Sequence, residues 1–249
     1  MKMIISPAKQ MKTDSDSFSP ETCPYFFEKS RELFDCLKNM SYEQLKKVWQ
    51  CSDKLAGESF ERLSLTDFSK NITPALFAYD GIQYKYMAPS VMDFSALEYV
   101  KDHLFIISGL YGALKPFDGV VPYRLEMQSK GDFLSFKDLY SFWGGDIGDY
   151  ISQTDDTVIN LASKEYSKAV LPHLAKNTKV ITCVFGQMKK GKITEQAPLV
   201  KMARGEMVRF AAVNSVKNPE DLKNFDGLSF EYSEELSDEN NYIFMRKEK

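Results

Sequence analysis

Short apolar runs separate longer amphipathic segments along the chain, and each run ends at polar or turn-forming residues. Runs of this length, bounded by such residues, are typical of buried strands. They predict strands over residues 1–5, 75–79, 104–108, 157–161, 180–185, 228–232 and 242–246. The KKGK segment after the fifth run predicts a hairpin turn, and the polar residues 10–24 predict a surface loop.

Apolar residues at helical spacing mark the segments between these strands. Phe26, Phe27, Leu33, Phe34 and Leu37 follow the spacing of a core-facing helix over 25–40. Ser41 and Gln44 form a capping box, so residues 41–63 are expected to fold as helix, tight connection, helix. Further helices are predicted over 94–102, 138–151, 163–170 and 198–213.

The order of these elements indicates the fold class. Strands and helices are mixed without a regular βαβ rhythm, and the chain contains no repeat, low-complexity tract or obvious linker. We therefore expect an α+β (mixed α/β) fold over residues 1–249, as a single compact domain of irregular topology, and a monomer.

Composition narrows the class of protein. Of 249 residues, 43% are hydrophobic and 27% are charged, as in ordinary globular proteins. The four cysteines lack C-x-x-C spacing and the histidines number two, which predicts reduced thiols, no metal site and no cofactor. No signal peptide or membrane span is evident, so we expect a cytoplasmic protein without a membrane partner. A net charge of −3 argues against nucleic-acid binding over the whole surface but permits a local basic cleft.

Three predicted strands lead into loops that combine hydroxyls, exposed backbone amides and a lysine. Such loops are common phosphate cradles, although each could be an ordinary turn. Glycines in them would let a ligand approach the backbone closely. The candidate residues are Ser6 and Lys9, then Gly109, Tyr111, Gly112 and Lys115, then Ser163, Lys164 and Tyr166.

Two further segments carry candidate phosphate ligands. Arg124 and Glu126 alternate in PYRLEM and would share a strand face, either as a structural ion pair or as an arginine held for phosphate. In the helix over 198–213, Lys201, Arg204 and Arg209 lie opposite the apolar side and form either a solvated or a phosphate-binding face. Gly205 in this helix indicates close backbone approach.

The sequence lacks the common nucleotide-loop, zinc-protease and serine-hydrolase motifs. An enzyme acting on a nucleotide or nucleic acid stays possible, with Ser6 and Lys9 or Tyr111 and Lys115 as acid–base pairs. That hypothesis predicts a deep pocket, whereas simple DNA binding predicts an open groove.

The assembled segments resemble the peroxide stress protein YaaA family, from the first strand to the last. The resemblance rests on SPAK (6–9), SDKLAG (52–57), SGLYGALKPFD (108–118), PYRLEM (122–127), FW (142–143), INLASKEY (159–166) and KMARGEMVRF (201–210). One difference is YDGIQYKYM, which lacks the acidic residue expected after its glycine.

The resemblance implies a mixed α/β domain with a basic cleft, and DNA binding to duplex, bubble or junction forms. It also implies a role in resisting hydrogen peroxide, by protecting DNA or lowering free iron, without a firmly attached enzyme activity. A helix-hairpin-helix element is implied, for which residues 41–63 with Lys54 are the match, although Cys51-Ser52-Asp53 replaces the usual glycine-containing turn. We expect sequence-tolerant phosphate contacts from the clustered cations.

Overall fold

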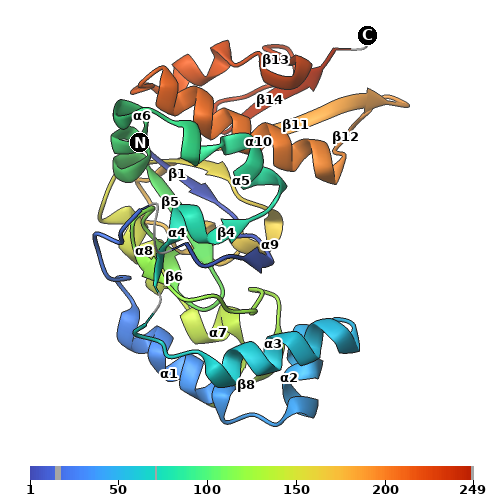
Figure 1. The fold of residues 1–249 in the computed structure, drawn as a ribbon. Helices are drawn as coiled ribbons and strands as arrows, with labels where there is room; N and C mark the ends of the chain where they lie inside the picture. The colour runs from blue at the N-terminus through green and yellow to red at the C-terminus, as the bar shows by residue number, and fades with distance from the viewer. Residues whose placement is uncertain (15–17, 71, 248–249) are drawn as a thin grey trace.

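A computed structural model describes residues 1–14, 18–70 and 72–247 of the protein. Its centre is an eight-stranded sheet in the order β13-β14-β11-β10-β1-β5-β6, with β12 paired to β11 (Figure 1). The five inner strands run parallel, and antiparallel partners close both edges. The strands are β1 (Lys2–Ile5), β5 (Leu104–Ser108), β6 (Gly112–Leu114), β10 (Thr157–Leu161), β11 (Lys179–Lys189), β12 (Lys192–Thr194), β13 (Phe230–Tyr232) and β14 (Asn241–Arg246).

The inner strands have the composition of strands that are covered on both faces. KMII, LFIIS and TVINL are almost continuously apolar, and their residues are buried with the exception of the first in β1 and in β10. Such runs suit parallel strands, which are covered on both faces. Because parallel strands end at the same edge, the residues that follow β1 and β10 lie next to one another, with Ile5 opposite Leu161.

Helices cover the sheet and extend beyond it. They are α1 (Phe27–Lys38), α2 (Tyr42–Trp49), α3 (Asp53–Leu65), α4 (Ala75–Ala78), α5 (Ile82–Met87), α6 (Phe94–His103), α7 (Leu139–Trp143), α8 (Asp146–Ser152), α9 (Lys164–Ser167) and α10 (Ala197–Val213). Four 3-10 segments lie at Pro89–Val91, Leu171–His173, Pro219–Asn224 and Gly227–Ser229. Short strand pairs join β2 (Gln10–Met11) to β4 (Tyr79–Asp80), β3 (Thr73–Pro74) to β7 (Gly119–Val120), and β8 (Lys130–Phe133) to β9 (Phe136–Asp138).

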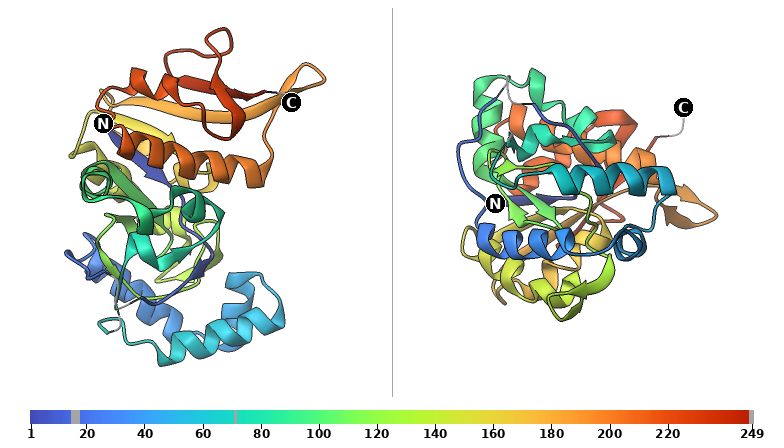
Figure 2. Two further views of the ribbon diagram at one scale, coloured as in Figure 1. Left: turned by 45° about the horizontal axis from the view of Figure 1, so that its top comes forward. Right: turned by 60° about the horizontal axis from the view of Figure 1, so that its bottom comes forward.

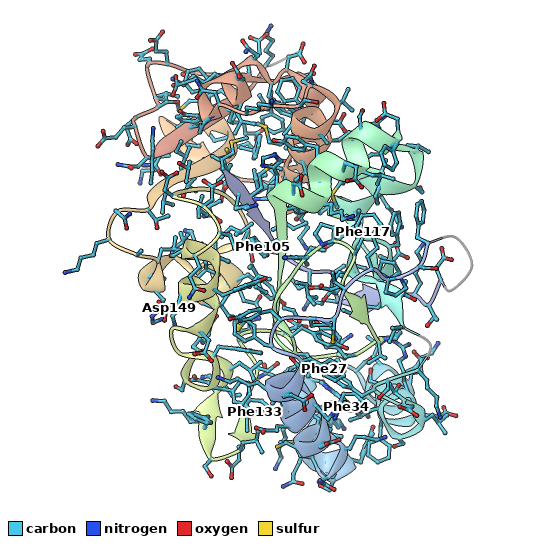
Figure 3. All side chains as sticks on the ribbon, turned by 90° about the vertical axis from the view of Figure 1, so that its left-hand side faces the viewer. Phe27, Phe34, Phe105, Phe117, Phe133 and Asp149 are labelled. Atoms are coloured by element: carbon cyan, nitrogen blue, oxygen red, sulfur yellow. The ribbon has the colours of Figure 1, made fainter. Side chains whose placement is uncertain are left out.

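Two projections lie on one side of the molecule. The β11–β12 hairpin and the α2–α3 connection both reach toward the same side in the two views of Figure 2. Elements β4, α5 and α9 lie between them in Figure 1. The lower part is built on an aromatic core: Phe27, Phe34 and Phe133 lie there (Figure 3), and the ring of Phe34 is 4.7 Å from that of Phe68.

The mixed α/β fold expected from the sequence is confirmed, and so are most of its elements. The capping box at Ser41 and Gln44 is present in full, and residues 41–63 form two helices joined at Gln50–Ser52. Gln50 takes the left-handed conformation that ends α2, with φ 44°. The hairpin at KKGK is also confirmed.

Three predicted elements need correction. Residues 75–78 form helix α4 and not a strand. The prediction was wrong because a short apolar run that is entirely buried has no periodicity by which a helix and a strand can be told apart. The helix expected over 138–151 is two helices, divided at Gly144, whose φ is +52°. The helix expected over 163–170 is only α9. The predicted loop 10–24 contains β2, and its residues 15–17 lie outside the described part of the chain.

Candidate functional site

The ends of β1 and β10 open into a pocket of about 360 Å³. The loop after β1, the start of α5, the segment after Pro122, the start of α9 and the first half of α10 form its walls. Its polar and charged lining residues are Ser6, Lys9, Gln10, Asp80, Gln83, Tyr84, Tyr123, Arg124, Glu126, Ser163, Glu165, Tyr166, Lys201 and Arg204. The carboxyl edge of parallel strands is where ligands bind in open α/β sheets.

Two serine hydroxyls join the ends of β1 and β10. The hydroxyl of Ser6 donates to Ser163 Oγ at 3.2 Å and accepts from the Ser163 backbone N–H at 2.9 Å. Tyr84 donates to the Ser6 carbonyl at 3.1 Å. Ser163 makes no side-chain capping bond to α9, and its hydroxyl accepts from Ser6 instead.

Glu126 is shared by two of the predicted phosphate ligands. Its Oε2 lies 2.8 Å from Lys9 Nζ, and its Oε1 lies 3.9 Å from a terminal nitrogen of Arg124. The two carboxylate oxygens therefore partly neutralise both cations. The ion pair that PYRLEM allowed is present, and it holds Arg124 at the pocket wall.

The wall formed by α10 is different, because its cations have no carboxylate partner within ion-pair distance among the described residues. Lys201 is exposed and Arg204 is half-buried, one helical turn apart. Burial lowers the pKa of Arg204, and the carboxylate of Glu195 opposes that shift. An arginine remains charged at neutral pH in this situation. Arg204 therefore lines the pocket and is not part of the solvated face that the sequence allowed.

Three buried donors in the pocket walls lack hydrogen-bond partners within the described residues. Gln83 is 6% exposed, and its amide nitrogen makes no hydrogen bond within the described chain. The Nε of Arg204 is likewise buried and unpaired, as is the Nε of Arg124. An unpaired buried donor costs roughly 1–3 kcal/mol, so such groups are uncommon in native proteins.

Glu165 supplies a second carboxylate on the opposite wall. It accepts a hydrogen bond from the backbone N–H of Gln128 at 3.1 Å. Burial raises the pKa of Glu165, the Gln128 bond and the charge of Lys9 counteract this, and the charge of Glu126 adds to it. Burial also raises the pKa of Tyr166, which lies beside Glu165 in the same wall.

The structure corrects the expectation that Tyr111 and the two glycines near it face a ligand. Tyr111 is 1% exposed, and its hydroxyl accepts from the backbone N–H of Val121 at 3.1 Å. A Cβ on Gly109 would lie 2.6 Å from the Leu125 carbonyl, and one on Gly112 would lie 2.9 Å from Trp143. Both glycines thus admit close approach by the protein's own groups.

The remaining predicted cations lie away from the pocket lining. Lys115 is exposed at the end of β6, Lys164 is exposed on α9, Lys54 is exposed on α3, and Arg209 is half-buried on α10. Neither proposed catalytic pair forms. The hydroxyl of Ser6 bonds to Ser163 while the ammonium group of Lys9 pairs with Glu126, and Tyr111 is committed to Val121.

Sequence reasoning missed the charge of the β11–β12 hairpin. Lys190 and Gly191 both have positive φ, 50° and 74°, as a two-residue hairpin turn requires. Lys189 stands directly opposite Lys192, a repulsive arrangement, and the three lysines of this turn make no ion pair with a described carboxylate. Gln83 was missed too, since nothing in its sequence context marked it.

Two features are absent from the described residues. No helix in residues 1–14, 18–70 and 72–247 is long and apolar enough to cross a membrane. Within the same residues, no group of three or more His, Cys, Asp or Glu side chains is placed to hold a metal ion.

Comparison with known proteins gives a consistent result over nearly the full chain. The model of a family described as peroxide stress protein YaaA matches residues 1–236. A UPF0246 protein of Desulfitobacterium hafniense is 48% identical over 246 residues, which are 99% of this chain and 98% of that protein. UPF0246 proteins of Pediococcus pentosaceus and Lachnoclostridium phytofermentans are 46% and 44% identical over 248 residues, covering all of this chain and 99% and 97% of theirs.

Proposed function

Since the chain belongs to the peroxide stress protein YaaA family, we propose that it acts in the response to hydrogen peroxide as a DNA-binding protein that protects DNA. The DNA is held through its phosphates, by cations on the side of the molecule that bears the pocket. Duplex, bubble and junction DNA all present such phosphates, so binding is tolerant of sequence.

One observation carries this proposal: Lys201 and Arg204 stand at the pocket without a carboxylate partner in the described chain, although acidic residues outnumber basic ones, 35 to 32. An unpaired arginine and lysine one turn apart suit phosphate oxygens. The hairpin with Lys189, Lys190 and Lys192 leads into this end of α10 through Glu195 and Gln196, and its lysines are further candidates for phosphate contact.

The α2–α3 connection is a second candidate contact on this side. Ser52 caps α3 by accepting from the Leu55 N–H at 3.5 Å, and Lys54 is exposed in the first turn. However, Lys46 pairs with Asp53 at the same turn, which places a negative charge where a phosphate would lie. We therefore assign this connection a smaller share of the binding than α10 and the hairpin.

The test is a salt titration of DNA affinity by fluorescence anisotropy, with duplex, bubble and junction probes. Each phosphate contact contributes a slope of about −0.9 in log K against log salt. We expect Lys201→Gln to reduce the slope by about 1, and the triple change Lys189→Gln, Lys190→Gln, Lys192→Gln to reduce it by about 2–3.

A matched control removes charge at the far ends of the same two elements. Lys176 lies before β11 and Lys217 after α10, both exposed. β11 has 11 residues, so Lys176 lies beyond roughly 36 Å of strand from the hairpin turn, and the end of α10 at Val213 lies roughly 14 Å beyond Arg204. Lys176→Gln with Lys217→Gln should leave the slope unchanged. Absence of binding by the wild-type protein at low salt would reject the proposed function.

An enzyme acting on a nucleotide or nucleic acid is a second candidate, favoured by the site being a pocket lined by Ser6, Ser163 and Glu165. Since Ser6–Lys9 and Tyr111–Lys115 do not pair, Glu165 is the better candidate for proton transfer, because its raised pKa moves it toward neutrality. Chromatography of nucleotides and oligonucleotides after incubation with equimolar protein tests this. Product that disappears with Glu165→Gln would support it, and unchanged substrates would reject it.

A further inference from the structure

Helix α5 brings a buried amide to the side of Arg204. Gly205 of α10 faces α5 so closely that a Cβ there would lie 2.0 Å from the Gln83 carbonyl oxygen and 2.9 Å from the Met87 nitrogen. No other residue type fits, so Gly205 fixes the approach of the two helices. Gln83 contacts Gly205 across the two helices, and Arg204 precedes Gly205 in the chain. Both therefore line one wall of the pocket, together with Lys201.

This wall contains hydrogen-bond donors and a cation that have no partner within the described residues. The Gln83 amide nitrogen and the Arg204 Nε are buried and unpaired, and Lys201 makes no ion pair in the described residues. On the opposite wall the Nε of Arg124 is also buried and unpaired within the described residues, but there Glu126 already supplies a carboxylate to both Lys9 and Arg124. A ligand that completes the α5–α10 wall must bring acceptor oxygens and negative charge.

We infer that the pocket binds one nucleotide-sized phosphate ester, with Lys201, Arg204 and Gln83 around the phosphate. The choice of phosphate over carboxylate rests on the proposed DNA binding; the need for an anionic acceptor does not. The terminal amide torsion of Gln83 is soft, so its unpaired N–H group can turn to a phosphate oxygen.

The rest of the pocket suits the remainder of a nucleotide. Its volume of about 360 Å³ is at the small end of the range for small-molecule sites, too large for a phosphate alone. Asp80, just before α5, and Glu165, at the start of α9, offer carboxylate acceptors for sugar hydroxyls or base amino groups. Ala8, Ile82 and Leu125 give the pocket apolar wall for the flat part of such a ligand.

The phosphate ester can come from two sources, a free nucleotide or a nucleotide turned out of DNA. Both present the same group to the α5–α10 wall. An unpaired nucleotide costs least to extrude, so bubble DNA would outcompete fully paired duplex in the second case.

The test is isothermal titration calorimetry with thymidine 5′-monophosphate, thymidine and inorganic phosphate as probes. Wild-type protein should bind the monophosphate more tightly than either of its parts. Gln83→Leu keeps the apolar volume of the side chain and removes the amide, and it should weaken monophosphate binding about tenfold or more. Lys201→Gln, an exposed position that does not endanger folding, should weaken it to a similar degree. The control Gln187→Leu, on β11 outside the pocket lining, should bind as wild type does.

Equal affinity of the wild-type, Gln83→Leu and Lys201→Gln proteins for the monophosphate, or no binding by any of them, would overturn the inference. Displacement of a labelled bubble DNA by the monophosphate would identify the DNA-borne source, and binding without displacement would identify the free nucleotide. Failure of the proposed function is separately visible, because DNA affinity in the salt titration depends on the hairpin lysines as well as on the pocket.

Discussion

The loop after β5 and the pocket after β1 contain the same kinds of residue, but they differ in how their polar groups are hydrogen-bonded. Each follows a buried parallel strand with a serine, a tyrosine and a lysine close by. In the loop after β5 the protein satisfies its own polar groups, whereas in the pocket several donors are buried without hydrogen-bond partners in the described part of the chain. The difference lies in what packs across from each loop and not in the loop's composition.

The loop after β5 is a closed network. The hydroxyl of Ser108 accepts from the backbone N–H groups of Leu110 and Tyr111, at 3.2 and 2.9 Å, and bonds to the Tyr123 hydroxyl at 2.7 Å. Trp143 Nε1 donates to the Gly109 carbonyl at 3.0 Å. With these donors satisfied, the loop has a structural role, and the pocket is the better ligand site.

Breaking the α5–α10 contact should have the largest effect. Gly205→Ala forces a Cβ into the Gln83 carbonyl, so we expect a loss of about 3 kcal/mol or more in the free energy of unfolding, together with loss of ligand binding. The matched control is Gly57→Ala in α3, where a Cβ would meet nothing within 4 Å. It should raise stability by up to about 1 kcal/mol. Urea denaturation of both variants measures the contrast, and similar stabilities would contradict it.

Removing the Ser108 hydroxyl from the hydrogen-bond network after β5 should have the second largest effect on stability. Ser108→Ala leaves two buried N–H groups without their acceptor and removes one of the two partners of the Tyr123 hydroxyl, which keeps Tyr79. It should cost about 2–3 kcal/mol of unfolding free energy. DNA and nucleotide affinity at low temperature should stay as in the wild-type protein. The exposed Ser64→Ala in α3 is a suitable control, with an expected change within about 0.5 kcal/mol. If Ser108→Ala selectively lost DNA or nucleotide binding, the loop after β5 would have to be counted as part of the ligand site.

The converse change in the pocket should affect stability less. Gln83→Leu removes a buried donor that has no hydrogen-bond partner among residues 1–14, 18–70 and 72–247, so the free energy of unfolding of the ligand-free protein should be unchanged or rise by up to about 1 kcal/mol. Denaturation without ligand, compared with the calorimetric affinity, separates a binding role from a structural one. A destabilised variant would mean that the amide serves the fold.

The smallest effect concerns pH. Burial raises the pKa of Glu165 above the ordinary glutamate value of 4.5, so the folded state binds this proton more tightly than the unfolded state. Stability is therefore lost as pH rises from the unfolded to the folded pKa. Glu165→Gln should be more stable than the wild-type protein at pH 7, and the gain should disappear below about pH 4. A gain that persists or grows in acid would show that the charge is not its cause.

The sequence was sufficient for the elements with a strong pattern. Continuous apolar runs predicted β1, β5 and β10, and helical periodicity predicted α1 and α10. It could not decide residues 75–78, because all four are buried and either structure fits. It also could not show that the inner strands pair in parallel, since pairing depends on contacts between segments far apart in the chain.

The same limit explains which site residues were found. Ser6, Lys9, Arg124, Glu126, Ser163, Tyr166, Lys201 and Arg204 were predicted and all line the pocket. Gly109, Gly112 and Tyr111 carried equal local signals, yet Trp143 and the segment around Leu125 pack against them. Gln83 could not be predicted as a pocket residue, because its position depends on the contact of its helix with Gly205 on another helix. Local sequence shows which residues are polar, and the tertiary packing decides which remain unpaired.

Photo-crosslinking can show whether DNA contacts the pocket wall and the β11–β12 hairpin. The protein is irradiated with bubble DNA in which 5-bromodeoxyuridine replaces thymidine, and the crosslinked peptides are mapped by mass spectrometry. We predict crosslinks in residues 79–87 and 187–204, the segments that carry the pocket wall and the hairpin, and none in residues 105–118. Crosslinks confined to residues 105–118, or to segments remote from the pocket such as α6, would contradict the account.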